Sequence, residues 1–176
     1  MDAEGAQHPI VVIGAGASGA LLAIRLVERG ATVALIERRG AFGPGLAYGT
    51  ADPAHLLNVR AGRMSSRPGE PDHFTRWLGA RGLDTDAEGF ARRADYGAYL
   101  KDQLGEAAAT GRLALIDGEA TSIETGRVVL TGGRVMEAAH VVLATGNGPP
   151  TGSPADDPAV INDPWAPGAL DAVRPS

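Results

Sequence analysis

The chain has 176 residues, a formal net charge of −5 and no cysteine. This length suits one compact core. The missing cysteines exclude disulfides, thiolate chemistry, cysteine-ligated zinc and iron–sulfur clusters, so any redox chemistry requires an organic cofactor. The acidic balance argues against a nucleic-acid-binding surface. An acidic N-terminus and short apolar runs favour neither a secretory signal nor a membrane span, so we expect a cytoplasmic protein without membrane or nucleic-acid partners.

The N-terminal part of the sequence predicts a βαβ unit. Residues 10–13 form a continuous β-branched run, typical of a strand buried on both faces of a parallel sheet. Residues 17–29 predict a helix that stops before Gly30, and residues 32–36 predict a second strand. The crossover between the two strands should be right-handed.

The middle of the chain is less regular. Residues 38–71 are rich in Gly, Pro, Arg and Ser and show no clear period, which is typical of a long functional loop. A helix is predicted over residues 71–81, with its apolar side buried. A second helix is predicted to begin with Asp95 as its N-cap and to run to Gly111.

The remaining strands complete an α/β fold with two kinds of sheet. Residues 113–116 and 141–144 read as further strands of the parallel sheet, the latter buried. Glycines separate three short segments that predict an antiparallel meander: residues 119–124, 127–131 and 134–137. We expect the parallel strands in the order third, second, first, last, with the meander on one face and the 17–29 helix on the other.

A glycine-rich motif joins the first strand to the first helix. Its sequence is Gly14-Ala15-Gly16-Ala17-Ser18-Gly19, a GxGxxG pattern. In this context Gly14 permits the tight turn, Gly16 lets the backbone approach a pyrophosphate, and Gly19 allows close helix–strand packing. The free N–H groups and the helix dipole then favour an anion. The motif predicts a dinucleotide-binding turn.

An acidic residue follows at the expected distance. Glu37 closes the second strand 18 residues after Gly19, close to the roughly 20 typical of such folds, where an acid binds the adenosine ribose. Its carboxylate disfavours the 2′-phosphate of NADP, although Arg38 and Arg39 weaken that exclusion. The βαβ unit alone leaves FAD and NAD as alternatives.

Several further motifs carry a resemblance to a known family. They are Gly43-Pro44-Gly45-Leu46-Ala47-Tyr48-Gly49, Leu56-Leu57-Asn58-Val59-Arg60-Ala61-Gly62-Arg63-Met64-Ser65, Asp72-His73-Phe74, Tyr96-Gly97 and Ala144-Thr145-Gly146. Together with residues 10–37 they resemble the bacterial FAD/NAD(P)-binding proteins grouped with FAD-dependent urate hydroxylase and aspartate N-monooxygenase. The resemblance implies a Rossmann-like FAD-binding domain, with NAD(P)H as reductant in the whole proteins and a small-molecule substrate that the sequence does not name.

The resemblance also implies residue roles. The residues implied to contact the FAD pyrophosphate are Gly14, Gly16, Ala17, Ser18 and Gly19. Glu37 would bind the ribose with Arg38 beside it, and the backbone of Ala120 would face the adenine. Ala144, Thr145 and Gly146 would pass under the ADP moiety. Asn58 and Met64 lie in a loop that the family directs towards the flavin, and its mixture of donors and apolar groups suits a ring pocket.

The pattern divides the chain into an FAD/NAD(P)-binding domain, residues 10–147, and a Pro/Gly-rich segment, residues 148–176. Residues 161–165 resemble the family's lead-in to a second domain, and no second GxGxxG occurs. We therefore expect an incomplete flavoprotein whose uncovered sheet edge promotes association. A non-catalytic nucleotide-binding module and an NAD-dependent dehydrogenase domain are the alternatives. No residue stands out as catalytic and no histidine has metal-ligand spacing.

Overall fold

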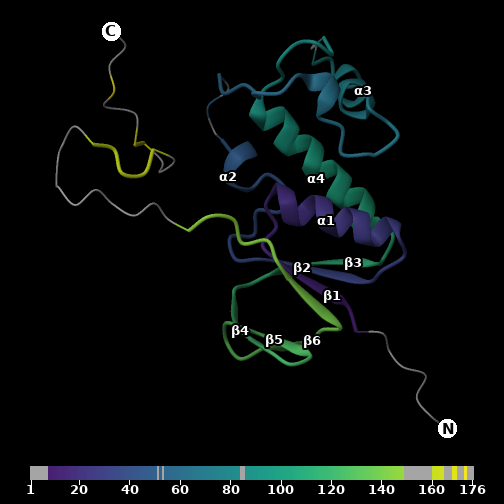
Figure 1. The fold of residues 1–176 in the computed structure, drawn as a ribbon, viewed down its shortest axis with the longest axis vertical. Helices are drawn as coiled ribbons and strands as arrows, with labels where there is room; N and C mark the ends of the chain where they lie inside the picture. Colours follow the sequence, from purple (N-terminus) through teal and green to yellow (C-terminus); the bar gives the residue numbers. More distant parts are fainter. Residues whose placement is uncertain are drawn as a thin grey trace. The chain divides into compact units, whose positions relative to one another are not determined.

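A computed structural model describes residues 8–50, 52, 54–83, 86–148, 160–164, 168–169 and 173. The chain divides into two compact units, Met1–Thr145 and Gly146–Ser176. All helices and strands described below belong to the first unit (Figure 1). In the second unit, Asn162 lies in a bend and Pro164 in a turn, whereas Trp165, the last residue of the predicted lead-in, lies outside the described residues.

A parallel sheet of four strands organises the first unit. Its members are β1 (Ile10–Ile13), β2 (Val33–Glu37), β3 (Leu113–Asp117) and β7 (His140–Leu143). They pair in the order β3-β2-β1-β7, which confirms the order predicted from the sequence. The chain steps from β1 towards β3 and then returns to the other side of β1. The carboxyl end of β1 is therefore a topological switch point, where open α/β sheets bind ligands.

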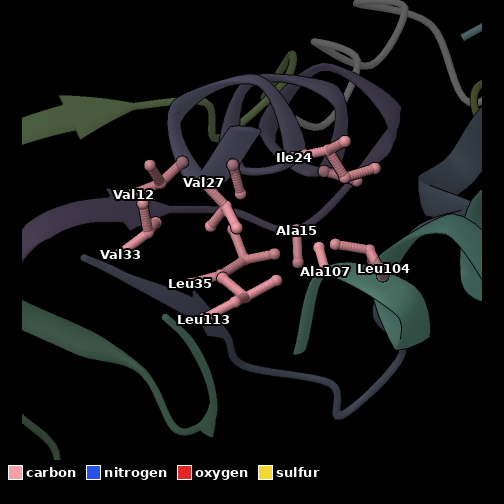
Figure 2. Close-up of a cluster of buried hydrophobic side chains, with 11 residues drawn as sticks. Val12, Ala15, Ile24, Val27, Val33, Leu35, Leu104, Ala107 and Leu113 are labelled. Carbon is pink, nitrogen blue, oxygen red and sulfur yellow. The ribbon is translucent and has the colours of Figure 1, made fainter. Parts of the chain in front are cut away.

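Two helices cover one face of this sheet, α1 (Ala17–Glu28) and α4 (Arg93–Ala109) (Figure 1). Figure 2 shows their apolar side chains meeting those of the strands. Val12 and Leu35 from the strands are fully buried against Ile24 of α1 and Leu104 of α4. Burial of this apolar layer is the main stabilising contribution on the helical face.

The opposite face carries the antiparallel sheet of β4 (Ala120–Glu124), β5 (Arg127–Leu130) and β6 (Val135–Glu137). Side chains alternate along a strand, so Val11 and Ile13 point away from the helices. They pack with Val128 and Leu130 of β5. The predicted meander and its position opposite α1 are both confirmed.

A third layer lies outside α1 and α4. It contains the short helix α2 (Gly45–Tyr48), the 3-10 turn η1 (Ala61–Arg63) and α3 (His73–Gly79). Its core is an aromatic cluster in which Phe74 and Tyr99 have no exposed surface. The stretch predicted as a long functional loop, residues 38–71, thus includes two short helical turns.

The start of α4 differs from the prediction. Arg92, not Asp95, is the N-cap, with an extended backbone at φ −70° and ψ 145°. Residues 55–56 set this start, because Arg92 forms a β-bridge with Leu56 and the Arg93 N–H donates to the His55 carbonyl at 2.8 Å. The chain therefore enters the helix earlier than local propensity indicates. Asp95 lies in the first helical turn, where the helix dipole favours an acidic side chain.

The burial predicted for the last parallel strand is wrong. Within the described residues β7 pairs with β1 alone, and Leu143 is 63% exposed. A β-branched run predicts burial on two faces, but an edge position leaves one flank of the strand uncovered. Within the described part of the chain, no helix combines the length and apolar character needed to cross a bilayer.

Candidate functional site

The predicted binding residues gather at the carboxyl ends of three neighbouring strands. β1, β2 and β7 run in parallel: Gly14 follows β1, Ala144 follows β7, and Glu37 is the last residue of β2. Backbone hydrogen bonds continue the sheet past the strand ends: Gly14 N–H donates to the Ile36 carbonyl and Ala144 N–H to the Ile13 carbonyl, both at 2.8 Å. The turn formed by residues 14–19, the 14–19 turn, is thereby fixed at the switch point of the sheet.

Two glycines of the turn are required by the protein itself. Gly14 has φ +99°, and a Cβ there would lie 2.4 Å from the Ala144 carbonyl oxygen. A Cβ on Gly19 would lie 1.9 Å from the Gly14 carbonyl oxygen. Both distances are far below van der Waals contact with backbone atoms that cannot move freely. Gly14 and Gly19 therefore allow β1, β7 and α1 to approach closely.

The middle glycine differs, because nothing in the protein requires it. Gly16 has φ −64°, which any L-residue adopts. A Cβ added to Gly16 would have the Gly45 Cα as its nearest neighbour, at 3.6 Å. Ordinary packing would thus accept alanine at this position. The space beside Gly16 fits a group from outside the chain that must approach the backbone closely, as a pyrophosphate does.

The first turn of α1 offers unpaired donors to such a group. Gly16 is the N-cap, no side chain caps the helix, and the first turn holds no acidic residue. Within the described residues, the N–H groups of Gly16, Ala17 and Ser18 have no hydrogen-bond partner. Free N–H groups and the positive end of the helix dipole together favour an anion.

The Glu37 carboxylate is held in place by two backbone N–H groups. Ala15 N–H donates to Oε2 at 2.9 Å, and Arg39 N–H donates to Oε1 at 3.1 Å. Each carboxylate oxygen accepts more than one hydrogen bond, so both remain able to bind hydroxyl groups. The side chain that the sequence assigns to the ribose is therefore positioned directly beside the 14–19 turn.

The end of β2 also lies close to the start of β4. The Arg38 guanidinium lies 3.5 Å from the Glu119 carboxylate, and both side chains are exposed. Thr131 N–H donates to the Glu119 carbonyl at 2.8 Å. Pair types alternate along an antiparallel ladder, so the next facing residues, Ala120 and Leu130, form a non-hydrogen-bonded pair. The N–H and carbonyl of Ala120 consequently point to the outer edge of β4, away from β5.

The other predicted binding residues make fewer contacts with the 14–19 turn. Thr145 ends the first unit, and its nitrogen would lie 3.1 Å from a Cβ on Gly14. Gly146, with φ +70°, belongs to the second unit. Asn58 is exposed in a bend, whereas Met64 packs on the aromatic cluster that also contacts Ala17 of α1. Within the described residues, no hydrogen bond joins Asn58 to the 14–19 turn.

A family model described as FAD-NAD(P)-binding matches residues 11–148. The chain belongs to this FAD/NAD(P)-binding family. The match runs from the second residue of β1 past the end of β7, so the fold described above is that of an FAD/NAD(P)-binding domain. No curated protein matches the chain.

Solved structures with the same fold include flavin-dependent monooxygenases. A steroid monooxygenase bound to NADP aligns with 24% identity and a TM-score of 0.60, covering 85% of this chain and 28% of its own. Cyclohexanone monooxygenase in an open form aligns with 20% identity and a TM-score of 0.60, covering 85% and 29%. OTEMO in complex with FAD and NADP gives 21% identity, a TM-score of 0.52, and coverage of 85% and 27%. This FAD/NAD(P)-binding domain thus spans under a third of each of these chains.

Sequence reasoning missed a second segment that packs on the turn. Gly43 N–H donates to the Ala15 carbonyl at 2.8 Å, and a Cβ on Gly45 would lie 2.8 Å from the Gly16 Cα. Both glycines have positive φ, at +105° and +56°. The closely spaced glycines were visible in the sequence, and close approach of two backbone segments is the physical reason for them.

A buried hydrogen-bond network was also missed. The hydroxyl of Tyr99 lies 2.7 Å from the Ser66 hydroxyl and 2.6 Å from His73 Nδ1, and it accepts the Ser66 N–H at 3.1 Å. Burial lowers the pKa of His73, Arg67 and Arg76 lower it further, and Glu70 and Glu106 oppose them. No sequence motif identifies this network, because its members come from three separate segments.

Proposed function

We propose that this domain binds FAD and is the FAD-binding part of an NAD(P)H-dependent flavoprotein oxidoreductase of monooxygenase type. The observation that carries the proposal is the space beside Gly16. It is bordered by free N–H groups, it is not needed by the protein's own packing, and the Glu37 carboxylate lies next to it. This combination suits the ADP half of a dinucleotide.

Each part of the ADP moiety has a candidate partner. The N–H groups of Gly16, Ala17 and Ser18 would bind the pyrophosphate, and the oxygens of Glu37 would accept the ribose hydroxyls. The outward-facing backbone of Ala120, with Arg38 nearby, would meet the adenine edge. In this proposal Ala144, Thr145 and Gly146 pass beneath the ADP moiety.

The choice of FAD rests mainly on the resemblance. The Glu37 carboxylate would repel a 2′-phosphate, which disfavours NADP but not NAD. The resemblance to FAD-dependent urate hydroxylase and aspartate N-monooxygenase supports FAD, and OTEMO, which shares the fold, was solved with both FAD and NADP. Bound FAD supplies two-electron redox chemistry and, in such enzymes, reaction with oxygen, while the protein supplies position and electrostatics.

The flavin ring has fewer candidate contacts in this chain. Asn58 and Met64 are the residues proposed to face it, from the segment around η1. We therefore expect this chain to bind the ADP half of FAD and to add little affinity for the ring. The substrate, and the turnover of the whole enzyme, are expected to depend on further parts of the kind that its longer structural relatives contain.

Paired calorimetric titrations with FAD and ADP test this proposal. Similar affinities for the two ligands are expected, together with no steady NADPH oxidation by the purified chain. FAD binding more than a hundredfold tighter than ADP, a difference of about 2.7 kcal/mol, would show that the chain holds a complete pocket for the flavin ring. That result would contradict the expectation that the ring adds little affinity. Failure to bind either ligand would overturn the proposed function itself.

Two variants locate the ligand. Gly16→Val should abolish binding of FAD and ADP alike, because the branched side chain fills the space beside the turn. Gly105→Val is the matched control, since Gly105 lies in α4 with no atom within 4 Å of an added Cβ. Glu37→Ala should weaken both ligands by about 1–3 kcal/mol, the scale of hydrogen bonds to a charged group. Unchanged affinity in both site variants would remove the assignment.

A further inference from the structure

A cavity lies along α1, and no residue of the 14–19 turn lines it. It has a volume of about 440 Å³ and separates α1 from the segment that includes η1 and residues 65–71. Ala17, Leu21 and Arg25 follow each other at intervals of four residues and share the face of α1 turned to this segment. Arg25 lies nine residues after Gly16, which corresponds to about 13 Å along the helix axis. The cavity is therefore distinct from the turn.

The charged side chains that line this cavity are all arginines. Arg25, Arg63 and Arg67 contribute to its wall, and no carboxylate side chain of the described residues does, although the protein carries a formal charge of −5. Accumulating guanidinium groups around one cavity is electrostatically unfavourable unless carboxylates or a ligand compensate. The three arginines differ in how many of their N–H donors are paired with acceptors of the protein.

Arg67 is fully engaged by the protein. Its Nε donates to the Gln103 Oε1 at 2.9 Å, and its Nη atoms lie beside the carboxylates of Glu106 and Glu70. These contacts fix the guanidinium in position at the cavity wall. A planar guanidinium held in this way is pre-organised for a further acceptor.

Arg25 and Arg63 have unused donors. Arg25 Nη1 pairs with Glu28, but its Nη2 is buried without any hydrogen-bond partner. Arg63 is exposed and forms no ion pair or side-chain hydrogen bond within the described residues. A buried guanidinium nitrogen without an acceptor is costly, because its lost hydration is not replaced. Because Nη2 itself has almost no accessible surface, an anion in the cavity would meet the exposed part of the Arg25 side chain and the Arg63 guanidinium.

A polar floor accompanies these donors. Ser66 lines the same cavity, is 6% exposed, and is held by the Tyr99 hydroxyl, which is itself fully buried. The wall therefore combines guanidinium donors with a fixed serine, while Leu21 adds an apolar side. Sites for small molecules typically combine a few oriented polar groups with apolar surface in this manner.

We propose that this cavity binds a small molecule through a carboxylate or phosphate group, held by Arg25 and Arg63 with Arg67 and Ser66 at its wall. Arginine suits both groups because its planar donors match their paired oxygens. The proposal does not depend on FAD binding at the 14–19 turn, from which the cavity is separated along α1.

Titration of the ¹⁵N-labelled chain with inorganic phosphate at constant ionic strength tests the proposal. The arginine Nε–H signals of Arg25 and Arg63 should shift saturably. Arg63→Gln and Arg25→Gln should each weaken the apparent phosphate affinity at least fivefold. Arg134→Gln, an exposed arginine next to β6, is the matched control and should leave it unchanged. Because Arg63 is exposed, its substitution should preserve the fold, which thermal unfolding of each variant checks.

A parallel titration with succinate separates the two ligand chemistries. A response to phosphate alone assigns a phosphate ligand, a response to succinate alone assigns a carboxylate, and a response to both supports the shared chemistry. No saturable shift with either probe would overturn the proposal. It would also be overturned if phosphate binding were lost in Gly16→Val but retained in both arginine variants, since the anion would then occupy the 14–19 turn.

Discussion

At the 14–19 turn the chain presents backbone N–H groups, whereas the cavity beside α1 presents side chains. The turn is built from consecutive residues. Gly14 and Gly19 admit close approach of the protein's own backbone, and Gly16 is the position proposed to admit a ligand. The cavity wall joins α1 to a distant segment, and Tyr99 of α4 holds Ser66 in place. Substitutions that add a carbon atom should therefore disturb the 14–19 turn most. Substitutions that remove a polar group should disturb the cavity most.

The largest effect should separate the glycines of the turn. Gly19→Ala places a Cβ 1.9 Å from the Gly14 carbonyl oxygen, so α1 must shift from β1. The free energy of unfolding should fall by about 3 kcal/mol or more, at the upper end of overpacking effects. Gly16→Ala should change it by less than about 0.5 kcal/mol while weakening ADP binding. Urea denaturation measures both, and equal destabilisation would contradict the different roles assigned to these glycines.

Tyr99→Phe should give the next largest change. Removal of the hydroxyl leaves the buried Ser66 N–H without its acceptor, at 3.1 Å in the intact protein. The expected loss of stability is about 1–3 kcal/mol. Tyr48→Phe is the control, because Tyr48 packs on the same aromatic cluster but its hydroxyl forms no hydrogen bond within the described residues. Equal effects of the two substitutions would show that ring packing, and not the hydrogen bond, is measured.

The pH dependence of stability should reveal His73. Burial, with Arg67 next, lowers the pKa of His73 from its ordinary value of 6.5, so the unfolded chain binds the proton more readily. Stability should be fully present above pH 6.5 and should fall as the pH drops through the lower folded pKa. Denaturation midpoints at pH 7.5 and 5.5 should differ less in His73→Gln than in the wild type. His140→Gln, at the exposed start of β7, should retain the wild-type difference.

The smallest effect is expected at Arg38. Its ion pair with Glu119 spans 3.5 Å between exposed side chains, so Arg38→Ala should change the free energy of unfolding by less than about 0.5 kcal/mol. A change in FAD affinity with unchanged stability would support its proposed place beside the adenine. A loss of stability above 1 kcal/mol would show that this pair fixes the start of β4 to the end of β2.

The β1–α1–β2 unit could be predicted because its signals are contiguous. A β-branched run, three spaced glycines and an acid at the strand end each have a physical reason that acts within a few residues. The Ser66 and His73 contacts of Tyr99 span 33 and 26 residues along the chain, and no spacing rule connects them. The exposure of β7 was equally hidden, since burial of a strand depends on which strand lies beside it.

The hydroxyl of Tyr99 has one proton to share between two neighbours, and this gives the network a direction. When His73 Nδ1 carries a proton, it donates to the Tyr99 oxygen, and Tyr99 in turn donates to the Ser66 oxygen. The Ser66 hydroxyl then accepts from Tyr99, and its own O–H is free to donate to another group. When Nδ1 is bare, Tyr99 donates to it and Ser66 must donate to Tyr99. The presence of a proton on Nδ1, in the neutral Nδ1–H tautomer or in the imidazolium, therefore decides whether the cavity wall at Ser66 offers a donor or an acceptor.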